Sequence, residues 1–220
     1  WHKQSAEVSA TPIEAFDCPS TYEPNPTEDI RLEDIINNYV YGTTDYVLSK
    51  GASDAMCILS SFLKQKGPGD MDIRLRGVFD FNWGVGVHQI TDGASNTFAV
   101  GEASGSPHWH VCHGAGCTET VPDMTGQLPT AWMGWIIAQP SSKQFLAAGL
   151  VITGPYAATV DPMNKYPVTD MYVDTKTFYT HPQFSPGCPG SDTGMSEDAV
   201  PNFRSDHPGG CNFNFADGSV

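Results

Sequence analysis

A histidine-rich stretch is the part of this sequence whose residue types most resemble a chemical site. His108 and His110 are two residues apart, so an extended backbone would place both imidazoles on the same face. Imidazoles in that arrangement bind zinc or copper, and His113 or Glu119 would complete the ligand set. The alternative is a surface loop that holds no metal. The candidate metal ligands are therefore His108, His110 and His113.

A second candidate is the turn-rich segment Asp92–Thr97. Asp, Asn, Ser and Thr side chains close turns by bonding to their own backbone, so we expect a loop held by its own hydrogen bonds. We further expect Asp92→Ala to cost about 1–2 kcal/mol of stability. The same oxygen atoms are typical calcium ligands, although the spacing of an EF-hand is absent. Calcium or a transition metal are thus the cofactor candidates.

The sequence argues against several enzyme classes. No Gly-x-Ser-x-Gly segment occurs, so an α/β-hydrolase is not indicated. Ser205, Asp206 and His207 are adjacent, whereas the members of a catalytic triad converge from separate segments. A carbohydrate-binding module is a further alternative, because four tryptophans could form a platform for sugar stacking. They are Trp83, Trp109, Trp132 and Trp135. The three-residue spacing of the last two also fits a hydrophobic core.

The cysteine content indicates an oxidising, extracytoplasmic location, either periplasmic, on the cell surface or secreted. The chain has 6 cysteines, an even number, in a sequence rich in loops. Cys112 and Cys117 are the first expected pair, because a short loop containing glycine closes easily. The connectivity of the other four is open, with Cys188–Cys211 as second choice and Cys18–Cys57 by elimination.

Charge and composition restrict the partners and the fold class. The net charge of −14 argues against nucleic acid and against an anionic membrane surface. No apolar run reaches transmembrane length, so we expect no membrane contact from these residues. Charged residues make up only 16% of a chain that contains 22 Gly and 17 Pro, which favours short strands and long loops over a helical bundle.

These patterns predict one domain over residues 1–220 with short strands, one or two short helices and a loop-rich insertion around 104–200. The clearest helix is Ser53–Lys66, which has an apolar stripe and ends at a Gly-Pro-Gly stop. The expected strands, from alternation and apolar runs, are Pro12–Cys18, Asp45–Leu48, Val78–Phe81, Thr97–Val100 and Met171–Val173.

The C-terminal stretch has the pattern of a strand followed by a hairpin turn. Phe213 and Phe215 alternate with asparagines, as in a half-buried strand. Asp217-Gly218 is a strong signal for a tight hairpin turn. The return strand would begin at Ser219, so we expect the natural chain to continue further.

Four stretches follow one another in a defined order: Phe16–Ser20, Asp45–Val47, Ile90–Thr97 running into Val100–Glu102, and His207–Val220. Together they resemble the DUF1559 family of prepilin-type surface proteins from planctomycete-like bacteria. The resemblance implies a type IV pilin or type II secretion pseudopilin-like head of the α+β class, with a mainly antiparallel sheet packed on a long N-terminal helix. That helix is not part of this sequence and would supply the membrane contact. Pseudopilin heads in related families hold calcium in acidic loops.

The function implied by the resemblance is structural: assembly or adhesion at the cell surface, with other pilin-like subunits or surface components as partners. A non-enzymatic role is favoured. The first alternative is a metal-dependent enzyme that uses the His108–His113 loop, and the second is the carbohydrate-binding module. Within the resemblance, Phe213 and Phe215 face inward, against the long helix or the apolar residues near Trp132. Gly218 takes a positive φ, and His207 anchors a loop through backbone hydrogen bonds.

Overall fold

Short strands dominate the part of the chain that the computed structural model describes, namely residues 6–22, 24–28, 40–52, 76–80, 83–112, 117–120, 122, 126–128, 130–131, 133–135, 156–169 and 201–220. The helical elements in these ranges are short: α1 (Ala6–Ser9), η1 (Glu14–Phe16), η5 (Val87–Gln89) and η6 (Ala94–Asn96). None of the helices described has the length and apolar character that a membrane crossing requires. The strands are β1 (Thr27–Glu28), β2 (Val40–Tyr41), β3 (Thr43–Thr44), β4 (Tyr46–Ser49), β5 (Phe79–Asp80), β6 (Trp83–Gly84), β7 (Phe98–Glu102), β8 (Val111–Cys112), β9 (Met133–Gly134), β10 (Tyr156–Ala157), β11 (Val168–Thr169) and β12 (Phe213–Phe215).

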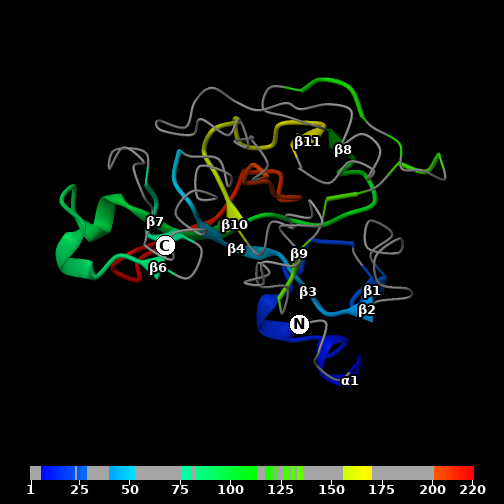
Figure 1. The fold of residues 1–220 in the computed structure, drawn as a ribbon, viewed down its shortest axis with the longest axis horizontal. Coiled ribbons are helices and arrows are strands. Elements are labelled where there is room, and N and C mark those ends of the chain that lie inside the picture. Colours follow the sequence, from blue (N-terminus) through cyan, green and yellow to red (C-terminus); the bar gives the residue numbers. More distant parts are fainter. Residues whose placement is uncertain are drawn as a thin grey trace, which may run out of the picture.

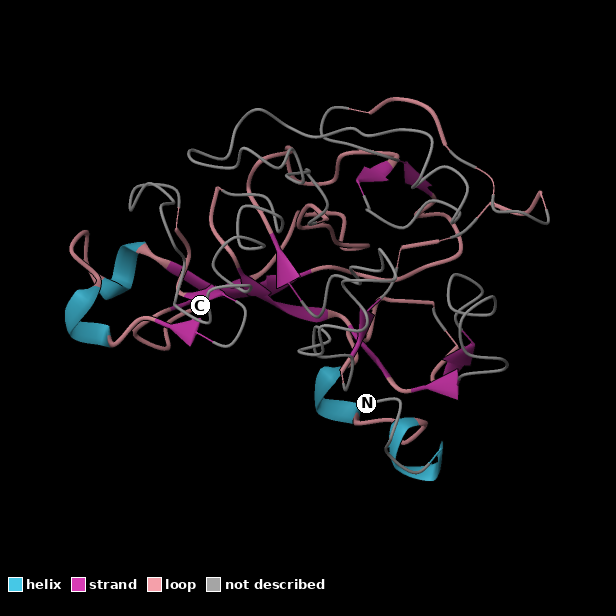
Figure 2. Ribbon diagram, in the orientation of Figure 1, coloured by secondary structure: helices cyan, strands magenta, loops and turns pink. Residues whose placement is uncertain are grey.

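The central sheet has the strand order β10-β4-β7-β12 (Figure 1). Strand β7 pairs antiparallel with β4 on one side and with β12 on the other, whereas β10 joins β4 in parallel. Figure 2 shows the short helices at the periphery of this sheet. The predicted α+β class with mainly antiparallel strands is confirmed at this level of detail, and the expected strands at 45–48 and 97–100 correspond to β4 and β7.

Smaller pairs of strands surround the central sheet. The pairs β1–β2, β3–β9 and β5–β6 are antiparallel, while β8 and β11 are parallel. Strand β3 directly precedes β4, and only Asp45 separates the two. The chain between β3 and β4 is therefore held on both sides, by β9 and by β7.

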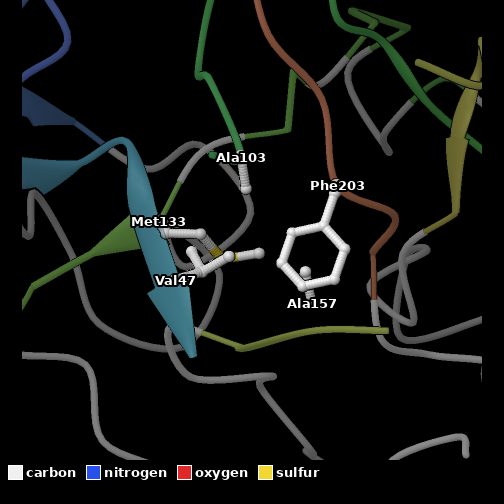
Figure 3. Packing of buried hydrophobic residues seen from close by; sticks show 5 residues of the cluster. All are labelled: Val47, Ala103, Met133, Ala157 and Phe203. Atoms are coloured by element: carbon white, nitrogen blue, oxygen red, sulfur yellow. The ribbon is translucent and has the colours of Figure 1, made fainter. Parts of the chain in front are cut away.

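The main hydrophobic core lies against the central sheet. Phe203 is fully buried and packs with residues that come from four separate segments (Figure 3). Phe213 packs against the same cluster. The rings of Phe203 and Phe213 meet edge to face, with centroids 4.9 Å apart. A second cluster holds the β8–β11 pair. The first cluster consists of Val47, Ala103, Met133, Ala157 and Phe203, and the second of Trp109, Val111, Ala131 and Val168.

A buried arginine ties the segment after residue 200 to the centre of the sheet. Arg204 forms a parallel bridge with Ala103, just beyond the end of β7. Its side chain is fully buried, and the guanidinium donates hydrogen bonds to the carbonyl oxygens of Ser104, Asn202 and Ala131. A buried cation is tolerated only when its donors are satisfied, so these bonds hold three segments in one arrangement.

The C-terminal hairpin turn forms as predicted, but Phe215 is less buried than expected. Gly218 has φ +88°, and Asp217 accepts hydrogen bonds from the backbone and hydroxyl of Ser219. Phe213 packs toward the core. Phe215 is only half-buried and lies beside Phe98, with ring centroids 5.1 Å apart. A register shift between Asn214 and Phe215 interrupts the alternation, so the second phenylalanine does not enter the core.

One predicted strand is wrong, and two predicted elements fall on residues outside the described ranges. Instead of a strand at 12–18, the chain forms the turn η1, in which the Phe16 N–H donates to the Ile13 carbonyl. The predicted helix at 53–66 and the strand at 171–173 lie outside the described residues. The single-domain boundary at 1–220, with an insertion around 104–200, stays a prediction.

Gly101 lies where the two core phenylalanines approach the central strand. A Cβ at this position would be 2.6 Å from the Phe213 ring and 2.7 Å from the Phe203 ring. We expect Gly101→Ala to lower the free energy of unfolding by about 1–3 kcal/mol, because the added methyl overpacks the core. Gly209→Ala is the matched control, since nothing lies within 4 Å of its Cβ position. Equal denaturant midpoints for the two variants would contradict this packing.

The two phenylalanines Phe203 and Phe215 differ in burial and therefore in their contribution to stability. Truncating the fully buried Phe203 to alanine should cost about 3–5 kcal/mol, as a core aromatic does. Phe215→Ala should cost clearly less, because the side chain already contacts solvent. Urea unfolding of both variants measures the difference, and a Phe215 effect as large as that of Phe203 would restore the original expectation.

Candidate functional site

Three side chains from distant parts of the sequence converge beside the central sheet: Cys18, Glu102 and His207. The Nε2 atom of His207 is 3.2 Å from the Cys18 sulfur and 3.2 Å from Glu102 Oε1. The sulfur and Oε1 are 4.0 Å apart. Within the described ranges, this is the group of three potential metal-ligating side chains whose ligand atoms all lie within 4.8 Å of one another.

Cys18 is positioned by a buried aspartate. It follows η1, and its backbone N–H donates to Asp45 Oδ2 over 2.7 Å. The other oxygen of Asp45 accepts the N–H of Gly105 at 3.1 Å. Asp45 lies between β3 and β4, so the sheet fixes the aspartate and the aspartate fixes the cysteine. The Cys18 side chain is 4% exposed.

Glu102 is the last residue of the central strand β7 and pairs with Tyr46 on β4. Its side chain is only 1% exposed. Asn212 donates to both carboxylate oxygens, from its backbone to Oε2 at 2.9 Å and from its side chain to Oε1 at 2.8 Å. These bonds keep the carboxylate in one rotamer, with Oε1 directed at His207.

His207 occupies the loop between Arg204 and β12. Its backbone N–H donates to the Ser205 hydroxyl, and its carbonyl accepts the N–H of Gly210. The ring contacts side chains and not backbone: Cys18, Glu102 and the Ser20 hydroxyl, which is 3.1 Å from each ring nitrogen. We expected the His207 side chain to form hydrogen bonds with the backbone, and this expectation is wrong.

The surroundings of the cluster are acidic. The pKa of Tyr46 is raised, first by burial and then by the nearby charges of Cys18, Glu102 and Asp45. Burial also raises the pKa of the Asp45 carboxyl, and the hydrogen bonds from Cys18 and Gly105 oppose that shift.

The geometry differs from that of a catalytic triad. In a triad, the nucleophile and the orienting carboxylate bind opposite nitrogens of the imidazole. Here the thiol of Cys18 and the carboxylate of Glu102 both approach the same nitrogen, Nε2 of His207. Donor atoms gathered around one point are instead the arrangement of ligands around a metal ion.

A family model described as a protein of unknown function, DUF1559, matches residues 1–220. The chain belongs to the DUF1559 family. No curated protein and no solved structure matches it. In this DUF1559 chain, the four stretches that carry the resemblance all contribute to the cluster, through Cys18 and Ser20, Asp45, Glu102 and His207. That grouping is the signal by which the sequence could have indicated the site.

The predicted histidine ligands are distributed differently. His108 Nε2 is 3.1 Å from Asp206 Oδ1, and its other ring nitrogen bonds to Ser106. His110 forms a bridge with Thr130, and its buried Nδ1 has no hydrogen-bond partner in the described part of the chain. His113 lies outside the described residues. Metal binding by His108, His110 and His113 stays a prediction.

Trp109, between these two histidines, is buried in the second core cluster and donates its indole N–H to Asp206. It is therefore not available as an exposed surface for sugar stacking. Trp132 lies outside the described residues.

The expected Cys112–Cys117 disulfide is present, with Cα atoms 6.0 Å apart. Cys18 and Cys211 are free thiols, so the expected Cys18–Cys57 and Cys188–Cys211 pairs are wrong. The reason is the side-chain environment: the Cys18 sulfur is directed at the cluster, and the Cys211 sulfur is 3.7 Å from Asn164 Oδ1. Burial, followed by the charge of Glu102, raises the pKa of Cys211 to about 11.

The Asp92–Thr97 loop is held by its own hydrogen bonds, as expected, but not through the aspartate side chain. The Asn96 amide donates to the Asp92 carbonyl, and the Thr97 hydroxyl donates to the Gly93 carbonyl. Asp92 thus contributes its backbone, which a substitution would keep. The expected cost of Asp92→Ala is accordingly smaller than the sequence suggested.

Asp45 and Asp92 form a matched pair for testing how Cys18 is positioned. Asparagine has one acceptor oxygen, so Asp45→Asn leaves the buried N–H of Cys18 or Gly105 without a partner. We expect a loss of about 1–3 kcal/mol in unfolding free energy. The same change at the exposed Asp92 should stay within about 0.5 kcal/mol. Urea unfolding of both variants makes the comparison, and a neutral Asp45→Asn would show that the aspartate does not hold Cys18.

Proposed function

We propose that this chain is the extracytoplasmic head domain of a structural, pilin-like or type II secretion pseudopilin-like subunit. The observation that carries the proposal is how its buried carboxylates are used. Asp45 joins Cys18 to Gly105, and Glu102 joins β7 to Asn212. In the stretches that resemble the family, polar side chains thus connect distant segments of the backbone. Such use favours a structural role over turnover of a substrate.

The redox state of the cysteines supports the proposed location. Disulfides persist in extracytoplasmic compartments and are rare where thiols are kept reduced. The Cys112–Cys117 bond supports a periplasmic or cell-surface site for the domain. The acidic composition is consistent with a domain that faces water and does not bind an anionic surface.

The pilin-like part of the proposal concerns the sheet. Three neighbouring strands, β4, β7 and β12, run antiparallel, and Phe203 and Phe213 pack together beside them. We expect the sheet to pack on a long helix, as in pilin-like heads, and other pilin-like subunits to be the neighbours of the domain. These expectations rest on the family resemblance.

Crosslinking in intact cells tests assembly. A short amine- or carboxyl-reactive crosslinker applied to cells that make the full-length protein should yield a ladder of bands containing this chain and similar subunits. Alkylation before lysis, followed by peptide mapping, should find Cys112 and Cys117 protected as a disulfide.

The Gly101→Ala variant, whose core is overpacked, is the control. If the ladder depends on the native fold, this variant should form less of it. A protein recovered only as a monomer from the cytoplasmic fraction, with both thiols reduced, would contradict the proposal. An envelope location without any crosslinked neighbour would remove the assembly role.

A further inference from the structure

We propose that Cys18, Glu102 and His207 form a zinc-binding site. The inference rests on the geometry of these side chains and does not depend on the proposed assembly role. It concerns a different set of residues from the His108–His113 stretch and places the site beside the central sheet.

The separations of the donor atoms lie within a few tenths of an ångström of those around a tetrahedral ion. Zinc lies about 2.3 Å from sulfur and about 2.0–2.2 Å from nitrogen or oxygen ligands, which puts neighbouring ligand atoms about 3.3–3.6 Å apart. The observed separations are 3.2 Å for sulfur to Nε2, 3.2 Å for Nε2 to Oε1 and 4.0 Å for sulfur to Oε1. Small rotations of the side chains would bring all three donors to ligand distance.

The partners around the cluster orient the donors. The Ser20 hydroxyl is 3.1 Å from each ring nitrogen of His207, and in the tautomer that carries its proton on Nδ1 the Nε2 lone pair is available on the side of Cys18 and Glu102. The carboxylate of Glu102 is held by two bonds from Asn212, and the Cys18 backbone by Asp45. Supporting hydrogen bonds of this kind are typical of metal sites, where they fix the ligand rotamers.

The donor set selects the type of ion. One sulfur, one imidazole and one carboxylate suit zinc and related transition metals, whereas calcium and magnesium prefer all-oxygen sites. Binding replaces the thiol proton: Zn²⁺ and the Cys18 thiol give a zinc thiolate and one proton released to solvent. With the Glu102 carboxylate, the two negative charges balance the ion.

The burial of the three residues shows how an ion could reach the site, and their separation in sequence shows how binding would affect the fold. The His207 side chain is 33% exposed, so an ion can enter from its side, while Glu102 forms the closed base. Glu102 and His207 lie 84 and 189 residues after Cys18 in the sequence. A bound ion would therefore join the beginning, middle and end of the chain and stabilise the fold by binding the native state.

The main experiment compares zinc binding by two cysteine variants of the full chain. Wild type and Cys211→Ser should each bind one zinc ion after dialysis against zinc sulfate and removal of excess metal, with a thermal midpoint that rises with zinc concentration. Cys18→Ser should lose both effects, and cobalt(II) should show a thiolate charge-transfer absorption in the first two proteins only. Ser20→Ala should reduce zinc affinity by about 10–100-fold, as the loss of a supporting hydrogen bond does.

Alkylation of the wild-type chain tests the site without any substitution. Zinc should slow the reaction of Cys18 with iodoacetamide and leave the reaction of Cys211 unchanged, as measured by peptide mapping. The inference is overturned if wild type retains no zinc, if Cys18→Ser and Cys211→Ser bind it equally, or if zinc leaves the alkylation of Cys18 unaffected. A Cys18→Ser chain that fails to fold would leave the decision to this alkylation measurement.

Discussion

A buried carboxylate on the central strand is the constraint around which the rest of this domain is arranged. Glu102 ends β7 between two partner strands and has almost no contact with solvent. Burying an ionised group without partners costs several kcal/mol, so the surrounding chain must supply donors. Asn212 and His207 both come from the C-terminal segment, and their contacts with Glu102 bring that segment back across the sheet. The path of the last twenty residues follows from this requirement.

The same principle explains how a chain with short strands and long loops holds a defined shape. Regular backbone hydrogen bonds are few in such segments, and buried side chains take their place. Arg204 binds three carbonyl oxygens, and Asp45 binds two backbone N–H groups. Each of these groups is costly when unpaired, so alternative arrangements are disfavoured. The aromatic packing of Phe203 and Phe213 then adds stability to an arrangement that polar contacts have specified.

A zinc ion at Cys18, Glu102 and His207 would fit this design, because it would couple segments that polar contacts already bring together. It would also give the free thiol of Cys18 a defined role in a chain in which Cys112 and Cys117 form a disulfide. Assembly and metal binding are compatible in one domain, since an ion that stabilises a head also preserves the surface through which subunits meet. Either property can hold without the other.

Local features of this protein were determined by the sequence alone. The Cys112–Cys117 loop, the turn at Gly218 and strands β4 and β7 depend on residues within a few positions of each other, and their patterns were sufficient to predict them. Composition favoured short strands and long loops, and the α+β class with a mainly antiparallel sheet came from the family resemblance. Phe215 was misjudged, because a register shift in the pairing of β12 with β7 is not visible in the alternation of its own residues. The cluster was decided only by the tertiary structure: the Ser20 and His207 side chains meet across 187 residues. Their contact depends on the pairing of β4 with β7 and on the bridge between Arg204 and Ala103, and long-range pairings of this kind leave no periodic signal in the chain that forms them.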